Sequence, residues 1–226
     1  MEPTPLRTIE AVLDEFLTEQ RSCLSPKRAT DYEDIIELLK RFLNGYWPGH
    51  DQAEYDRTTA AGGSFCTSFG PEEMLEAYGE FLGYYMTHKV IAGKETLRLA
   101  GTVTKKLAAW LAEKEYVEDV EEAHERAKEA VRELPVATDA LGILRNHVEK
   151  QPPRKCSEEI QDHFTVAHVQ PGRLWLTPLT ERPDIIGPIP IPEEASRLLQ
   201  EHWDISGSVG RTRQGWVLLE VWNISP

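Results

Sequence analysis

The 226-residue sequence contains few cysteines, no long hydrophobic run and no excess of positive charge. Its three cysteines, Cys23, Cys66 and Cys156, are odd in number and widely spaced. This arrangement argues against a disulfide framework and against a zinc site built from thiolates. Because the seven histidines are equally scattered, the sequence predicts neither a metal site nor a cofactor.

Hydrophobic residues make up 40% of the chain, but no apolar stretch approaches the roughly 20 residues that a membrane-spanning helix needs. Residues 1–16 lack the basic-then-apolar order of a signal peptide and begin an amphipathic pattern at once. We therefore expect a globular, cytoplasmic protein that does not contact a membrane.

Basic residues are outnumbered, with 25 lysines and arginines against 38 acidic residues and a formal net charge of −13. Proteins that bind nucleic acids usually have a basic balance, because counterion release from phosphates supplies much of their affinity. Any contact with DNA must therefore come from a local group of cations that acts against an unfavourable overall field.

Motifs of the common enzyme classes are missing as well: there is no G-x-S-x-G elbow, no Walker loop and no dinucleotide glycine fingerprint. Cys66 would need a positioned base to act as a nucleophile, and His50 is the histidine near it in sequence. A buried or idle cysteine is the simpler interpretation, and we predict no enzyme. The third hypothesis is an enzyme with its site at the interface of two domains, which a deep pocket holding Cys66 or His163 with convergent polar groups would support.

Hydrophobic periodicity predicts four amphipathic helices, which should pack as one bundle-like domain. Residues 46–70 show no sustained period and predict a long loop. The expected helices cover residues 8–21, 26–45, 71–89 and 94–116, with Thr8 and Ser25 as N-caps.

The helix expected over residues 94–116 has two different faces. Its apolar residues share one arc at helical spacing, and Lys94, Arg98 and Lys105 lie close together roughly opposite that arc. Such a helix can pack on one side and meet phosphates on the other. The alternative interpretation is an ordinary solvated face.

Residues 117–150 continue the helical pattern with a thinner stripe of small residues, which Pro135 interrupts before a shorter helix over residues 138–149. A proline-containing stretch at residues 151–155 then predicts a stiff linker. We predict a helical domain at residues 1–116, a helical connector at 117–150 and a second domain at 151–226.

Beyond residue 155 the hydrophobic period changes from helical to two, which predicts strands. The overall fold class is therefore α+β, and the second domain should be a small, bent sheet or partly open barrel that binds a protein partner. Four tryptophans, Trp175, Trp203, Trp216 and Trp222, are expected in its core, with a ligand groove as the alternative. The expected strands cover residues 163–169, 173–179, 184–191, 203–212 and 215–224, the last two as a hairpin, with a short helix over 193–201.

Two stretches resemble a known family. SPKRATDYEDIIELLKRFL, residues 25–43, and TLRLAGTVTKKLAAWLAEKEYV, residues 96–117, are similar to the SAM-like core-binding domain of the tyrosine recombinases, the phage-integrase family. In that family the domain forms half of a clamp around duplex DNA, and basic helical positions touch phosphates. The resemblance implies the following contact residues: Lys27, Arg28, Lys94, Arg98, Lys105 and Lys106.

The catalytic residues of that family have no counterpart in this chain. The family uses a tyrosine nucleophile and a His-x-x-Arg motif in its second domain, whereas the last tyrosine here is Tyr116. The nearest imitation of the motif, at residues 147–150, ends in lysine. The resemblance therefore implies a non-catalytic, DNA-binding or recombination-associated protein. The alternative is an acidic protein-interaction or scaffolding protein that retains the integrase-like helical fold.

Overall fold

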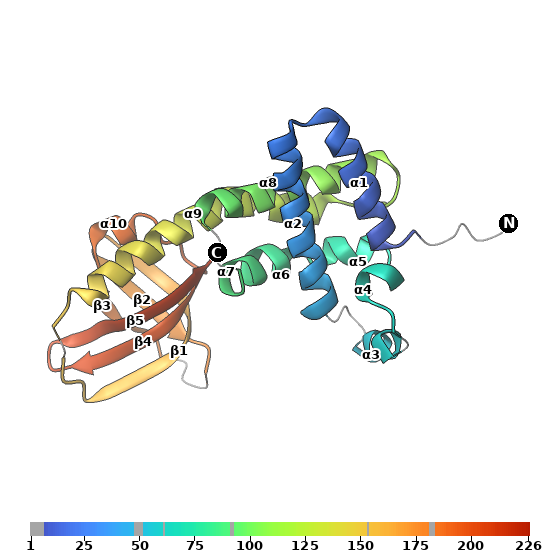
Figure 1. The fold of residues 1–226 in the computed structure, drawn as a ribbon. Coiled ribbons are helices and arrows are strands. Elements are labelled where there is room, and N and C mark those ends of the chain that lie inside the picture. Colours follow the sequence, from blue (N-terminus) through green and yellow to red (C-terminus); the bar gives the residue numbers. More distant parts are fainter. Residues whose placement is uncertain (1–6, 48–51, 61, 91–92, 153, 181–183) are drawn as a thin grey trace. The chain divides into compact units, whose positions relative to one another are not determined.

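The computed structural model describes residues 7–47, 52–60, 62–90, 93–152, 154–180 and 184–226 (Figure 1). The chain divides into two compact units, residues 1–131 and 132–226, which we call the helical unit and the sheet unit. The boundary falls inside helix α9 (Glu121–Glu149), within the expected connector. The α+β fold class is confirmed. None of the described helices is long and apolar enough to cross a membrane.

The first two helices match their predictions. α1 (Ile9–Cys23) is capped by Thr8, whose hydroxyl accepts a hydrogen bond of 3.3 Å from the Ala11 amide. α2 (Pro26–Gly45) follows at Ser25, whose side chain makes no capping hydrogen bond. Their apolar faces are buried and form much of the core of the helical unit.

The prediction of a long loop over residues 46–70 is wrong for the described residues of that range. It contains α3 (Gln52–Ala60) and α4 (Phe65–Ser68), and residues 48–51 and 61 lie outside the described residues. A capping box begins α4: the Ser64 hydroxyl accepts from the Thr67 amide, and the Thr67 hydroxyl accepts from the Ser64 amide. Both helices are too short, and α3 too weakly amphipathic, to produce a visible period.

The third predicted helix has the expected extent but is segmented. A π-helical turn interrupts it, and the aromatic stripe is buried as predicted, with Phe81 and Tyr85 packing 5.6 and 5.2 Å from the Phe42 ring of α2. The segments are α5 (Pro71–Glu76), α6 (Tyr78–Glu80), η1 (Phe81–Tyr85) and α7 (Met86–His88).

The fourth predicted helix is α8 (Lys94–Glu113), which has two buried faces. One packs into the core through residues such as Leu107 and Leu111. The other meets α9 at Gly101, where an added Cβ would lie 2.7 Å from Val131 Cγ2 and 3.0 Å from the Ala127 carbonyl oxygen. Because both faces are covered, only a narrow strip of α8 reaches solvent.

The predicted break at Pro135 is also wrong, because α9 continues through it. Proline lacks the amide that would bond to the carbonyl four residues earlier, which normally weakens a helix interior. Small apolar residues are buried on either side of it in the chain, including Ala127 and Ala130 before it and Ala137 and Ala140 after it. This burial of α9 compensates for the missing hydrogen bond.

The sheet unit contains one antiparallel sheet of five strands in the order β3-β2-β1-β4-β5. The residues of α9 after position 131 cover one face of this sheet through Ala137, Ala140 and Leu144 (Figure 1). The sheet is not closed, although its edge strands β3 and β5 contact each other. The strands are β1 (Glu158–Gln170), β2 (Arg173–Pro178), β3 (Ile186–Pro190), β4 (Asp204–Thr212) and β5 (Gly215–Ser225), and β4 and β5 form the predicted hairpin.

Two details of the sheet unit differ from prediction. The short helix α10 (Glu193–Ser196) ends earlier than residue 201. Of the four tryptophans, Trp203 lies in the buried core and Trp216 packs against that core. Trp175 is half-buried, whereas Trp222 is 39% exposed. Register shifts in the β4–β5 ladder alter the simple alternation, so Val221 points inward and Trp222 outward.

Candidate nucleic-acid interface and adjacent cavities

The exposed strip of α8 carries two of the six predicted contact residues. Arg98 and Lys106 are exposed, and no described carboxylate forms an ion pair with either of them. The strip also carries Glu95 and Glu113, one towards each end of the helix. It is therefore a mixed surface with two available cations at its centre, rather than a continuous basic stripe.

The other two predicted residues of α8 are less accessible. Lys105 is half-buried beside α9, where its charge acts on Glu125. The pKa of the Glu125 carboxyl is below its usual value, first because Lys128 donates a hydrogen bond to it and, in smaller part, because Lys105 is near. Lys94 is half-buried and already takes part in another interaction, so we do not count it among the available cations.

Lys27 and Arg28 lie in the first turn of α2 and are exposed. Among the described residues, no carboxylate pairs with either side chain. They do not line the cavity that holds Lys105 and Lys106. The structure thus places the six predicted residues in two groups on two helices.

A cavity of about 570 Å³ lies beside α8, and we call it the lysine cavity. It is bordered by the end of α1, one side of α8 and the first turn of α9. It brings Lys105 and Lys106 to one place. Its lining residues are Glu19, Gln20, Thr102, Lys105, Lys106, Ala109, Trp110, Glu113 and His124.

One acidic side chain of the lysine cavity is already engaged. Glu19 accepts hydrogen bonds from Lys114 and from the Trp110 ring nitrogen, the latter at 2.8 Å. These two bonds, that of Lys114 first, lower the pKa of the Glu19 carboxyl. Glu19 therefore has its charge compensated from outside the cavity.

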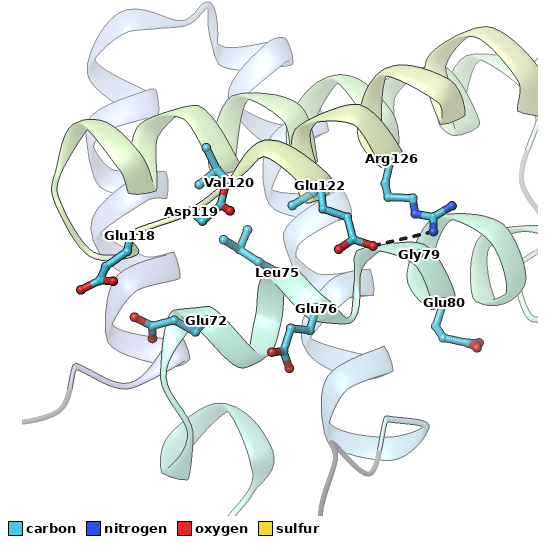
Figure 2. A pocket seen from close by; sticks show the side chains of 11 residues that line it. Glu72, Leu75, Glu76, Gly79, Glu80, Glu118, Asp119, Val120, Glu122 and Arg126 are labelled. Atoms are coloured by element: carbon cyan, nitrogen blue, oxygen red, sulfur yellow. Dashed lines mark ion pairs between the residues drawn. The ribbon is translucent and has the colours of Figure 1, made fainter.

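A second, larger cavity of about 840 Å³ is bordered by acidic residues, and we call it the acidic groove (Figure 2). Glu72, Glu76 and Glu80 line it from α5 and α6, which lie opposite the segment that leads into α9 (Figure 2). Glu118 and Asp119 come from that segment, and Glu122 comes from the first turn of α9.

The apolar floor of the acidic groove and its one lining cation come from α5, from α9 and from the residue before α9. Leu75 and Ala123 are buried beneath it, and Val120 is half-buried. Arg126 pairs with Glu122 at 3.7 Å, and both side chains are exposed. The lining therefore carries six carboxylates and one guanidinium, which makes the groove complementary to a cationic ligand.

On the sheet unit, large apolar side chains reach solvent at Leu179, Ile185 and Trp222. On β1, His168 hydrogen-bonds Glu201 at 2.7 Å and packs beside the Trp175 ring. In the described part of the chain, no group of three or more histidine, cysteine, aspartate or glutamate side chains is arranged so that it could hold a metal ion.

Sequence reasoning did not find Gln20, Trp110 or His124 as neighbours of the two lysines, because they lie on three different helices. Gln20 did leave a signal, since it occupies an apolar position of the first helix, three residues after Leu17. The spacing of Glu72, Glu76 and Glu80 also places three acids along one helical face. That a second acidic segment faces them could be seen only in the structure.

Comparison of the chain with models of known families, with curated proteins and with solved structures found no match.

Proposed function

We propose that this chain is a non-catalytic protein that contacts duplex DNA through basic positions of its helical unit. The observation that carries the proposal is the state of Arg98 and Lys106, which are exposed on α8 and unpaired with any described carboxylate. Lys105 lies next to them, and Lys27 and Arg28 form a second cationic pair on α2. Phosphate contacts of this kind position a protein without reading the base sequence.

The proposal includes kinship with the core-binding domain of the tyrosine recombinases, and a recombination-associated role in the cytoplasm. It is supported by the two long helices, α2 and α8, that carry the sequence resemblance. We further infer that the sheet, whose edge strands contact each other, is a partly open barrel. Its exposed Leu179, Ile185 and Trp222 make it a module for a protein partner.

The acidic groove favours a second candidate function, that of an acidic interaction or scaffolding protein. Its six carboxylates suit a basic segment of another protein, and its apolar floor suits the stems of long basic side chains. In this alternative the integrase-like helices are a support for the groove, and DNA is not bound.

A double charge reversal on α8 tests the DNA proposal. Arg98→Glu with Lys106→Glu should weaken retention of duplex DNA about tenfold or more at ~50 mM salt, and should reduce the slope of log K against log salt by about 2. The measurement is a salt titration by fluorescence anisotropy. Both side chains are exposed, so the unfolding transition should stay unchanged.

The matched control is Lys155→Glu with Arg213→Glu, which changes the net charge equally at exposed positions of the sheet unit. This control should retain DNA as the unmodified chain does. Absence of any retention at ~50 mM salt, or equal losses in both double variants, would contradict contact through α8 and favour the acidic interaction protein.

A further inference from the structure

Four cations gather around the β4–β5 hairpin of the sheet unit. Arg211 lies near the end of β4 and Arg213 in the turn after it, whereas Arg154 and Lys155 lie in the segment before β1. All four side chains are exposed, and no described carboxylate forms an ion pair with any of them. In a chain with a formal net charge of −13, such a group is a local exception.

Hydrogen bonds hold the two segments side by side. The amide and the hydroxyl of Ser157 donate to the Arg211 carbonyl oxygen at 2.8 and 3.1 Å. The Cys156 sulfur lies where a side chain at Gly210 would begin. The cations of the two segments therefore share one surface, although the segments are far apart in the sequence.

Two carboxylates begin β1 beside this group. Glu158 lies opposite Arg211 in the β1–β4 register and already takes part in another interaction. Glu159 lies opposite Gly210, and successive side chains of a strand point to opposite faces. The face that carries Arg211 therefore keeps an excess of positive charge.

The Arg211 side chain is held against an aromatic ring. Trp216 lies opposite Arg211 in the β4–β5 register, is half-buried and packs against the core of the sheet unit. The guanidinium carbon of Arg211 lies 5.6 Å from the centroid of the Trp216 ring, which is within the range of a cation–π interaction. Because the core fixes the ring, the ring orders the exposed guanidinium, and an arginine plane can stack on an unpaired nucleobase.

We propose that these residues, Arg154, Lys155, Arg211, Arg213 and Trp216, form a surface that binds single-stranded DNA, and we call it the hairpin surface. The phosphates contact the cations, and one base stacks on the Arg211 guanidinium above Trp216. A duplex offers no free base face to this guanidinium, and an acidic peptide carries charge without a base. The pairing of Arg211 with Trp216 therefore favours a single strand over either.

Binding at the hairpin surface does not depend on duplex contact, because its residues belong to the sheet unit and those of α8 to the helical unit. Fluorescence anisotropy of the full chain with a labelled thymidine oligonucleotide of ~12 nucleotides tests it. At ~50 mM salt the oligonucleotide should bind saturably. An abasic oligonucleotide of the same length has the same phosphates and should bind about fivefold more weakly or worse.

A conservative variant separates stacking from charge. Arg211→Lys keeps the positive charge but removes the planar guanidinium. It should weaken single-strand binding about three- to tenfold and leave the slope of log K against log salt unchanged, because the number of phosphate contacts is the same. Arg211 is exposed, so the unfolding transition should stay unchanged.

Charge reversal separates this surface from α8. Lys155→Glu with Arg213→Glu should weaken single-strand binding about tenfold or more and reduce the salt slope by about 1.4, while duplex retention stays unchanged. The matched control, Arg98→Glu with Lys106→Glu, changes the net charge equally and should leave single-strand binding unchanged. Failure of either proposal therefore leaves the other open to its own test.

Five results would overturn the assignment to single-stranded DNA. They are no retention of the oligonucleotide at ~50 mM salt, equal affinity for the abasic oligonucleotide, unchanged binding by Arg211→Lys, and equal losses in the two charge-reversed variants. The fifth is tighter binding of polyglutamate or of an RNA of the same length, which would assign the hairpin surface to an acidic peptide or to RNA instead.

Discussion

Burial sets the chemistry of Cys66. Its side chain is 1% exposed in α4, and its amide donates a hydrogen bond of 2.9 Å to the Asn44 side-chain oxygen. Burial raises the pKa of the Cys66 thiol to about 12, against a smaller opposing effect of Lys40. The thiol is therefore protonated at neutral pH and a poor nucleophile. The interpretation of Cys66 as a buried cysteine agrees with this environment.

The Cys66 thiol should make stability depend on alkaline pH. Between pH 9, its ordinary pKa, and pH 12, the unfolded chain releases the thiol proton and the folded chain keeps it. The free energy of unfolding should therefore fall as pH rises, by about 1.4 kcal/mol per pH unit from this group. Urea unfolding of the unmodified chain and of Cys66→Ala at several pH values measures this pH dependence of the unfolding free energy.

The variant Cys66→Ala isolates the contribution, because tyrosines titrate in both proteins. Its unfolding free energy should fall less steeply above pH 9 than that of the unmodified chain. Parallel curves of unfolding free energy against pH for the two proteins would show that the thiol ionises as easily in the folded chain as in the unfolded chain.

The packing of α8 against α9 depends on Gly101, which has no side chain. At Gly101 an added Cβ would lie 2.7 Å from Val131 Cγ2 and 3.0 Å from the backbone nitrogen of that residue. Valine is stiff about its first side-chain torsion, so Val131 cannot rotate away from an added Cβ. The clash is relieved only if α8 and α9 move apart. This close approach also positions Lys105 and His124 around the lysine cavity.

Gly101→Ala should therefore destabilise the helical unit by about 1–3 kcal/mol, in spite of the better helix propensity of alanine. Chemical unfolding followed by circular dichroism measures the change. The control Gly45→Ala adds the same methyl group at the end of α2, where no atom lies within 4 Å, and should leave stability nearly unchanged. Equal stability of the two variants would show that α8 and α9 pack more loosely.

At the scale of elements, helices with one regular buried face could be predicted from the sequence, whereas α4 and the continuity of α9 through Pro135 could not. α1, α2 and α8 each bury one regular face, so their period is visible over many residues. α4 depends on a single capping box, and α9 passes through Pro135 because burial outweighs one lost hydrogen bond. Neither effect produces a periodic pattern.

For the whole molecule, the division at residues 131 and 132 makes part of α9 integral to the sheet unit. Ala137, Ala140 and Leu144 belong to the same buried cluster as strand residues such as Phe164 and Leu176. The expected domain at 151–226 does not include them. Their removal would expose one side of the sheet core.

A fragment of residues 132–226 should therefore fold by itself, with a dispersed amide spectrum and a cooperative thermal transition. A fragment of residues 151–226 should lack such a transition, because it has lost the helix that covers the core. Nuclear magnetic resonance and calorimetry of both fragments measure this. Cooperative folding of the shorter fragment would mean that the sheet alone forms a sufficient core.

For the candidate site, too, some features follow from the sequence and others only from the tertiary structure. The sequence by itself determined the fold class, the helices α1, α2 and α8, the final hairpin and the number of cations that α8 carries, because local periodicity and turn chemistry depend on near neighbours along the chain. Only the tertiary structure decided that Arg98 and Lys106 are available, that Lys105 lies near Glu125, and that Gln20 joins the lysines at one cavity. Burial and pairing depend on contacts between distant residues, which no local pattern records.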